Sequence, residues 1–241
     1  KDPAIPSVIE DVFEKARHYQ VGVDSTGTPR YCDNFINDYY DDEGWWALAW
    51  IEASKLTGEK KYLDMAEIIF DDMTTGWSDA CGGGIFWKKN PLHYKNSIAN
   101  NLFSLTAIRL YKATQNPAYL DWFKKNVDWY TQTGMINTDI YQIEDGTKDD
   151  CTPNRNAHYT YNQGVAIAVL AEMYLQTNDK SYLELAEKIA DATITTQLVT
   201  DEGILREMKP EIDDSNDGVQ FKGIFIRHLA FLYEVTKNPA Y

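Results

Sequence analysis

The segment with the clearest chemical potential is Tyr39–Trp46, where two adjacent aspartates, Asp41 and Asp42, lie among four aromatic residues. A carboxyl pair can supply an acid together with a nucleophile, or an acid together with a base. Aromatic rings offer flat apolar faces with polar edges, which suit sugars. This combination indicates an enzyme that cleaves carbohydrates. The candidate sugar contacts within the segment are Tyr40, Trp45 and Trp46.

The plainer interpretation of the same segment is the start of a helix. An aspartate can cap a helix with its side-chain oxygen, and acidic residues are favourable in a first helical turn. The apolar run Trp45–Ile51 follows at once, as it would in a buried helix. Helix caps are far commoner than active sites, so the rest of the sequence must decide between the two interpretations.

Composition excludes several classes of function. The chain has 241 residues, enough for a single large domain, which we predict over 1–241. Its formal net charge of −14 argues against binding nucleic acid or anionic lipid, whereas a neutral polysaccharide would be indifferent to it. No apolar run is long enough for a transmembrane helix. The chain starts at Lys1 without a signal peptide, so we expect a processed or trimmed chain.

The cysteines and histidines indicate neither a metal site nor a cofactor. Cys32, Cys81 and Cys151 show no CxxC spacing, and one disulfide with a free thiol or three free thiols are both possible. Asp213, Ser215, Asp217 and Gly218 resemble the start of a calcium loop, but the twelfth position is isoleucine rather than glutamate. The histidines are scattered, at His18, His93, His158 and His228. We predict no metal and no cofactor.

A repeated turn organises the chain. Thr57–Leu63, Thr114–Leu120, Thr177–Leu183 and Thr236–Tyr241 share a threonine, a polar turn and a tyrosine. An apolar segment precedes each copy and predicts a buried inner helix, and the segments that follow are amphipathic and predict outer helices. Ile5–Tyr19 is predicted to be one more outer helix. The inner segments are 45–56, 98–111, 165–175 and 224–233, and the only short strand candidate is Ile85–Trp87.

Inner and outer helices joined in this way predict an all-α fold, an α/α solenoid or closed toroid. The outer-to-inner connections are long, at about 75–95, 134–160 and 198–219. These loops must emerge at one end, and Tyr39–Trp46 enters its helix from that same end. Long loops in a compact domain are usually functional. We therefore expect one loop-rich face that contains the aspartate pair.

The long loops carry further candidates. Trp87 and Tyr94 are candidate sugar platforms, or they fill the wall of the toroid. Asp145 could assist the pair or form a turn with Gly146. Amide side chains at helix starts could bind hydroxyl groups or cap the helix. The glycine run Gly82–Gly84 permits a close approach to a ligand but lacks the rest of a P-loop. The remaining candidate contacts are Asn96, Asn100, Tyr161, Asn162 and Gln163.

Five strings in this order make the chain similar to glycoside hydrolase family 76, the α-1,6-mannanases. They are Tyr40–Trp50, Cys81–Ile85, Tyr94–Asn100, Thr160–Gly164 and Phe221–Phe225. The resemblance implies an (α/α)6 barrel and retaining endo-hydrolysis of α-1,6-mannosidic linkages in microbial or fungal mannan. It also implies that Asp41 is the nucleophile and Asp42 the general acid/base. The partner would be the α-mannan polysaccharide, acted on by a monomer without a cofactor.

The aspartate roles set two structural conditions. Adjacent side chains diverge by about 100° in a regular helix, so the pair should lie in a turn or at a helix start. Retaining enzymes need carboxyl groups about 5 Å apart. For Asp42 to deliver a proton near neutral pH its pKa must be raised, and the charge of Asp41 and burial among the aromatic rings would both raise it.

The chain departs from the family pattern in length. The repeats and Ile5–Tyr19 predict about nine helices, whereas six hairpins need twelve. We therefore expect terminal helices to be lacking at both ends. Two other functions stay open: transglycosylation of mannan or a glycolipid-linked glycan at the same site, and non-catalytic glycan binding. A polymeric substrate leads us to expect a secreted, periplasmic or cell-surface protein.

Overall fold

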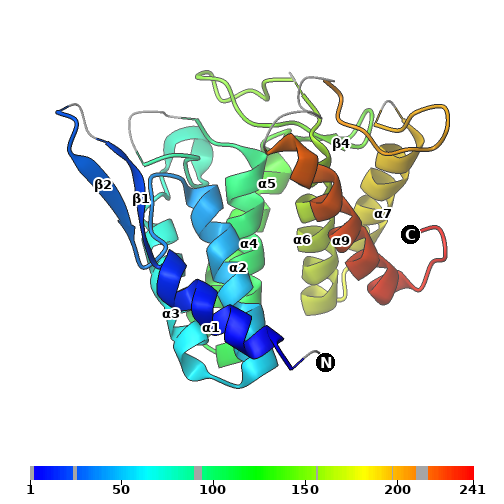
Figure 1. Cartoon of the computed structure of the whole chain (residues 1–241). Helices are drawn as coiled ribbons and strands as arrows, with labels where there is room; N and C mark the ends of the chain where they lie inside the picture. Colours follow the sequence, from blue (N-terminus) through cyan, green and yellow to red (C-terminus); the bar gives the residue numbers. More distant parts are fainter. Residues whose placement is uncertain (1–2, 24–25, 90–93, 156, 197, 210–216) are drawn as a thin grey trace.

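The computed structural model describes residues 3–23, 26–89, 94–155, 157–196, 198–209 and 217–241. In this part of the chain, helical hairpins lie side by side (Figure 1). The inner helices are α2 (Tyr40–Thr57), α4 (Ser97–Thr114), α6 (Thr160–Thr177) and α9 (Gly218–Thr236), and the outer helices are α3 (Lys60–Thr74), α5 (Pro117–Gln132) and α7 (Lys180–Thr195). Each inner helix contacts the next, and the first three pack against their own outer helices. The all-α prediction is confirmed.

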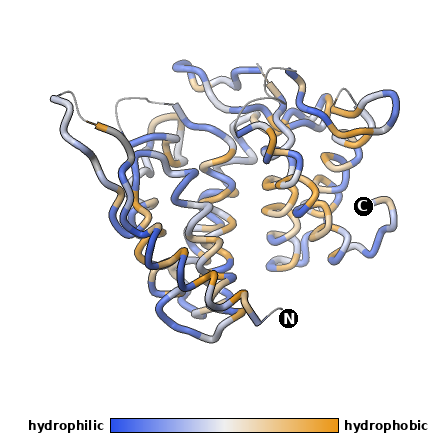
Figure 2. The backbone as a smooth tube through the Cα atoms, viewed as in Figure 1, coloured by the Kyte–Doolittle hydropathy of each residue, from blue (hydrophilic) through white to orange (hydrophobic). Residues whose placement is uncertain are grey.

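The burial of the two middle hairpins follows their apolar patterns, whereas α9, predicted as a buried inner helix, buries only Gly218, Phe225, His228, Leu229 and Leu232. Helices α4 and α6 bury most of their residues, whereas α5 and α7 bury a single stripe. Figure 2 shows hydrophobic positions along the helices and hydrophilic loops at the end where α6 and α9 begin. The long connections therefore gather at one end, as the sequence predicts.

The repeated threonine performs the same task in all four copies. Its hydroxyl donates to the carbonyl four residues back and accepts from the amide two residues on, as at Thr57 with Ala53 and Glu59. The next residue adopts a left-handed conformation and ends the inner helix. These helix-ending residues are Gly58, Gln115, Asn178 and Lys237.

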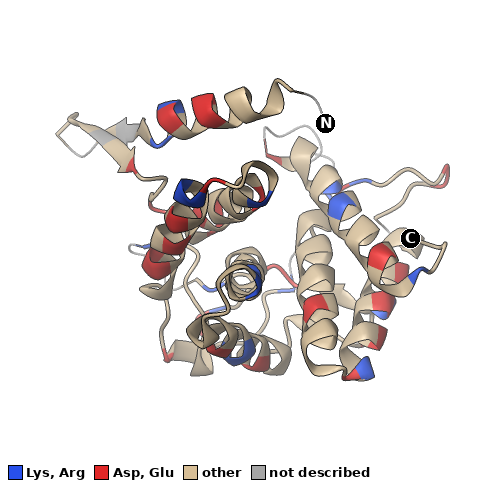
Figure 3. Ribbon diagram, turned by 90° about the horizontal axis from the view of Figure 1, so that it is seen from below, with Lys and Arg blue, Asp and Glu red and all other residues tan. Residues whose placement is uncertain are grey.

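The repeated tyrosine joins neighbouring hairpins. Tyr119 donates to Glu67 on α3 at 2.9 Å, and Tyr241 donates to Asp191 on α7 at 3.1 Å. Tyr62 donates to Glu10 at 2.7 Å, and Glu10 lies on α1 (Ile5–Ala16). Helix α1 therefore accepts a bond from the repeated tyrosine of the next hairpin, as the outer helix α3 does. Figure 3 shows α1 along the outside of the assembly.

The predicted helix Ile5–Tyr19 is too long. It ends at Ala16, and the chain continues as an antiparallel hairpin of β1 (His18–Val23) and β2 (Pro29–Asp33). In the sequence, valines alternate in β1 and a proline begins β2. This strand pattern is short, and it directly follows the strong helical pattern of Ile5–Ala16. The prediction that the chain lacks such strands is therefore wrong.

Smaller elements shape the second long loop and the glycine run. The loop contains the paired strands β3 (Ile136–Asn137) and β4 (Gln142–Ile143). The predicted strand Ile85–Trp87 reduces to one bridge, between Ile85 and Trp77. A 3-10 turn, η1 (Ala80–Gly82), precedes it. Among the described helices, none is both long enough and apolar enough to cross a lipid bilayer.

Candidate active site

A cavity of about 540 Å³ lies where the inner helices begin. All four contribute, since Asp41 belongs to the first turn of α2, Asn96 is the N-cap of α4, Tyr161 is the second residue of α6, and Asp217 is the N-cap of α9. Helix N-termini favour negative charge, which suits a site rich in carboxyl groups. The lining residues are Asp41, Asp42, Trp45, Trp87, Tyr94, Asn96, Asp145, Tyr159, Tyr161, Asp217, Gln220, Phe221 and Ile224.

The structure brings most of the predicted site residues into this cavity and leaves others outside it. Tyr40 is buried, with its hydroxyl 3.0 Å from that of Thr75. Trp46 stacks on Trp50 and packs against Phe35. Both rings therefore build the wall of the toroid, although they flank the aspartate pair in sequence.

Three predicted amides also lie outside the cavity lining. Asn100 and Gln163 are fully buried, and each bonds the backbone of a loop residue, Ile85 and Ile143 respectively, through both amide atoms. Asn162 donates to Asp145 Oδ1 at 3.1 Å. These amides hold loops in place. By contrast, Asn96 both lines the cavity and caps α4 by accepting from the Ala99 amide.

The aspartate pair lies at a helix start, as the sequence predicts. The N-cap of α2 is Tyr39, in an extended conformation, and it has no side-chain capping bond. Asp41 and Asp42 therefore fall within the first turn without acting as the cap residue. The N-cap role is therefore wrong for both, but the plainer interpretation is right that they are acidic residues of a first helical turn, whose N-terminal end favours their charge.

Asp41 is the more deeply placed of the two. Its Oδ2 accepts from the indole Nε1 of Trp87 at 2.9 Å. Its Oδ1 is buried and has no hydrogen-bond partner within the described part of the protein. Burial, followed by the charge of Asp42, raises the pKa of Asp41 to about 7, while the bond from Trp87 opposes the rise. Asp41 can therefore hold or release a proton near neutral pH.

Asp42 is more exposed, and its Oδ2 accepts from Asn37 Nδ2 at 2.9 Å. Burial raises its pKa, the bond from Asn37 opposes this, and the charge of Asp217 adds to it. The pKa of Asp42 is therefore raised, as the sequence predicts. The negative charge that contributes to the rise is that of Asp217, whereas the prediction named Asp41. The large upward shift falls on Asp41, because that carboxyl is the more buried.

A third carboxyl group, that of Asp145, lines the same cavity. Tyr94 donates its phenolic hydrogen to Asp145 Oδ2 at 2.5 Å, and Asn154 donates to the same phenolic oxygen. Burial raises the pKa of Asp145, and the bonds from Tyr94 and Asn162 counteract that rise. The hydrogen bonds fix the orientation of Asp145 beside the aspartate pair.

An aromatic wall completes the cavity. Tyr161 stacks on Phe221 with ring centroids 4.0 Å apart, and Tyr159 lies 5.8 Å from Phe221. The sequence prediction missed Tyr159, Asp217, Gln220, Phe221 and Ile224 as contacts. The last four follow the spacing of one helical face at the start of α9, a signal that could have found them.

Some predicted features lie elsewhere. Asp213 and Ser215 of the calcium-like loop, and His93, fall outside the described residues; Asp217 is described and faces the cavity. The described residues contain no group of three or more side chains suited to a metal ion. The close approach that the glycine run permits is to Trp129, because a Cβ on Gly84 would lie 2.3 Å from its ring.

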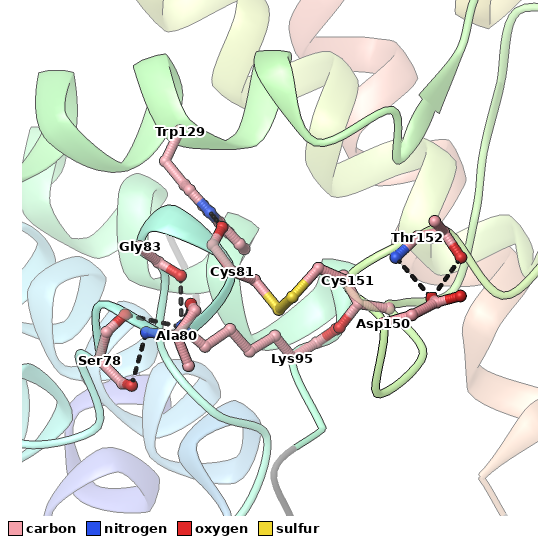
Figure 4. The surroundings of a disulfide bond; sticks show 10 residues. Ser78, Ala80, Cys81, Gly83, Lys95, Trp129, Asp150, Cys151 and Thr152 are labelled. Atoms are coloured by element: carbon pink, nitrogen blue, oxygen red, sulfur yellow. Dashed lines mark hydrogen bonds between the residues drawn. A yellow bond between two sulfur atoms is a disulfide. The ribbon is translucent and has the colours of Figure 1, made fainter.

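A disulfide between Cys81 and Cys151 connects the first two long loops (Figure 4), and Cys32 is a buried free thiol. This settles the open cysteine pairing. Beside it, the fully buried Lys95 ammonium donates to the carbonyls of Ser78 and Ala80 at 2.7 and 2.6 Å, and also to that of Gly83. Disulfide and ammonium together fix the loop that carries Tyr94 and Asn96.

This arrangement can perform acid chemistry on a neutral, hydroxyl-rich ligand. Three carboxyl groups with raised pKa values, Asp41, Asp42 and Asp145, line one cavity, and aromatic rings form its walls. Such walls suit the apolar faces of sugar rings.

Comparison with known proteins agrees with this site. The family model described as glycosyl hydrolase family 76 matches residues 6–240. Mannan endo-1,6-α-mannosidase DCW1 of Saccharomyces cerevisiae is 29% identical over 247 residues, covering 95% of this chain and 54% of that protein. The crystal structure of the Lin0763 protein from Listeria innocua has a TM-score of 0.78 and 34% identity, covering 86% of this chain and 58% of that one.

The GH76A α-1,6-mannanase of Salegentibacter sp. HEL1_6 has a TM-score of 0.77 and 29% identity, covering 85% of this chain and 60% of that one. A variant of that enzyme with two adjacent aspartates changed to asparagine is described as inactive and was solved with α-1,6-mannotriose. The chain spans about half the length of the curated relatives that it matches. On the extent of the family match, the chain belongs to glycosyl hydrolase family 76.

Proposed function

We propose that this protein hydrolyses α-1,6-mannosidic linkages within mannan, with retention of anomeric configuration, and that Asp41 and Asp42 are its catalytic residues. The observation that carries the proposal is the presentation of this adjacent pair, with raised pKa values, in a cavity walled by aromatic rings. The similar α-1,6-mannanase whose variant at two adjacent aspartates is inactive supports the assignment.

The proposed reaction has two displacements. The Asp41 carboxylate attacks the anomeric carbon while Asp42 gives its proton to the glycosidic oxygen, so the C–O bond breaks and a glycosyl ester forms on Asp41. Water then attacks the same carbon, Asp42 takes its proton, and the ester bond breaks to free Asp41. Two inversions at one carbon restore the original α configuration.

The proton distribution of the free protein sets the pH dependence. With a pKa of about 7, Asp41 is protonated in roughly half of the molecules at neutral pH. Asp41 must be ionised to attack, so activity should fall as pH drops below 7. Neighbouring carboxyl groups titrate as a pair, and a bound glycosidic oxygen can accept a hydrogen bond only from a protonated group. Substrate would therefore draw the shared proton to Asp42.

Tyr94, Asp145 and the aromatic wall would bind the mannose units. Asp145 has fixed acceptor oxygens for sugar hydroxyls, because Tyr94 and Asn162 hold it. The rings of Trp87, Tyr161 and Phe221 would cover the apolar sugar faces. Because the substrate would be a polymer, we also propose a secreted, periplasmic or cell-surface location, which the Cys81–Cys151 disulfide supports.

The test is incubation of the protein and its Asp41→Asn and Asp42→Asn variants with linear α-1,6-mannan, with products separated by size. The proposal predicts oligomers of intermediate length from the unsubstituted protein and a loss of at least about 10³-fold in both variants. Equal product formation by all three would remove the aspartates from the mechanism. Elongated products would indicate transfer to an acceptor sugar in place of hydrolysis.

A further inference from the structure

Both backbone groups of Trp87, the amide and the carbonyl, make hydrogen bonds that hold the residue near the aspartate pair. Its carbonyl accepts from the amide of Tyr40 at 3.0 Å, and its amide donates to the carbonyl of Tyr94 at 2.8 Å. Two residues later, the amide of Lys89 donates to the carbonyl of Asp38 at 2.9 Å. The loop around Trp87 therefore runs along the residues that lead into α2, and its indole donates to Asp41.

The side chain of Lys89 makes a second connection to the helices beneath. Its ammonium lies 2.6 Å from Oε1 of Glu43 and 2.5 Å from Oδ2 of Asp72. Glu43 is fully buried in the first turn of α2, directly after the aspartate pair, and its Oε1 also accepts from the amide of Asn37. Burying a polar or charged group in this way is costly unless the group is hydrogen-bonded.

We propose that Lys89 and Glu43 are positioning residues for catalysis: their contact ties the loop that carries Trp87 to the helix that carries Asp41, and so fixes the indole N–H against the Asp41 carboxyl. This inference rests on the proposed function of the aspartate pair. Neither side chain lines the cavity, so each would act through Trp87 rather than by touching substrate.

The pKa shifts of the two side chains indicate the role of each in this contact. Burial raises the pKa of Glu43 to about 8, with Lys89 opposing the rise. Although burial lowers the pKa of Lys89, its bonds to Asp72 and Glu43 outweigh that effect and raise it. Glu43 therefore serves chiefly as a hydrogen-bond acceptor for the Lys89 ammonium. An amide could replace Glu43 in that role, whereas an apolar side chain could not.

The expected consequence is a change in the titration of Asp41. Its bond from Trp87 lowers its pKa, so loosening that bond should raise the pKa above about 7. The variants leave the other titratable groups of the cavity unsubstituted: Asp42 on α2, Tyr94 and Asp145 on the loops, Tyr159 and Tyr161 at the start of α6, and Asp217 at the start of α9. A change in the pKa of Asp41 would thus report on its hydrogen bond from the Trp87 indole.

The experiment follows the indole N–H of Trp87 by NMR in protein with ¹⁵N-labelled tryptophan, with the resonance assigned through Trp87→Phe. In the unsubstituted protein, this resonance should titrate with a midpoint near 7, because Asp41 accepts the bond. In Lys89→Met and Glu43→Leu it should move upfield, with a higher midpoint. Glu43→Gln should restore the original position, because its amide oxygen can still accept from Lys89 and Asn37.

Activity and a matched control complete the test. Lys89→Met should lower kcat on α-1,6-mannan roughly ten- to a hundredfold with little change in KM, because a misplaced catalytic group costs rate more than affinity. Lys112→Met should change neither readout, since the Lys112 ammonium pairs with the buried Glu172 at the opposite end of the inner helices. The NMR readout does not require activity, so a failed substrate assay would leave it interpretable.

Two results would overturn the inference. An unchanged Trp87 resonance and midpoint in Lys89→Met, with or without a lower melting temperature, would reduce the contact to general support of the fold. If the Trp87 resonance moved upfield while kcat and the fall in activity below pH 7 stayed unchanged, the indole bond would not matter for catalysis.

Discussion

The phenolic hydroxyl of Tyr94 donates to the Asp145 carboxylate at 2.5 Å, joining the first long loop to the second inside the cavity. The two residues are 51 positions apart in sequence. Their contact orients a carboxylate that would otherwise be buried with fewer donors, since burial alone raises the pKa of Asp145.

Removing that donor should destabilise the protein. Tyr94→Phe leaves a partly buried oxygen of Asp145 without its phenolic donor, and the expected loss is about 1–3 kcal/mol in the free energy of unfolding. Urea denaturation at pH 7 measures it, with Tyr111→Phe on α4 as the matched control. Equal stability of the two variants would show that Asp145 gains nothing from Tyr94.

Asp41 should make the fold less stable as pH rises. Its pKa is raised from 3.8 to about 7 in the folded protein, so folding favours its neutral form. The favourable contribution is complete below pH 4 and is lost as pH rises through about 7. Asp41→Asn should therefore be more stable than the unsubstituted protein at pH 8, by up to about 4 kcal/mol, and less so at pH 5. A pH-independent difference in urea denaturation would contradict the raised pKa.

The disulfide should contribute substantially to stability. It closes a loop with a sequence separation of 70 residues, for which about 2–4 kcal/mol is the usual range. The double variant Cys81→Ser/Cys151→Ser should unfold at lower urea concentration, and reductant should lower the stability of the unsubstituted protein but not of the variant. If reductant affects both equally, Cys32 or another cause is responsible.

The two aspartates should be distinguishable by azide rescue. With a dinitrophenyl α-mannotrioside, whose leaving group needs no acid, Asp42→Gly should form the glycosyl ester, and azide should yield the α-azide. Asp41→Gly lacks the nucleophile, so azide should attack directly and yield the β-azide. NMR of the products identifies the anomer. Exchange of the two outcomes would exchange the two roles.

The helical layers and the aspartate pair could be predicted because they depend on local patterns. The repeated threonine-to-tyrosine turn places every inner helix, and Asp41 and Asp42 fall at a helix start. The partners of Asn100 and Gln163 could not be predicted, because an amide at a helix start serves a ligand or a loop backbone equally well. Their bonds to Ile85 and Ile143 depend on where distant loops return.

Other features could not be predicted from the sequence, for different physical reasons. The hairpin after α1 was hidden by a strong amphipathic helix directly before it. The Cys81–Cys151 pairing depends on the packing of two loops, which spacing does not encode. Phe221 and Gln220 had a helical periodicity that pointed to a shared face, but only the position of α9 shows that this face meets the cavity.

The most direct test of the proposed mechanism is the anomeric configuration of the first products from linear α-1,6-mannan, followed by ¹H NMR before mutarotation. Retention through Asp41 and Asp42 predicts that new reducing ends appear as the α-anomer and that the β-anomer grows in later. Initial release of the β-anomer would contradict the double displacement and would require a water molecule, rather than an aspartate, as the attacking group.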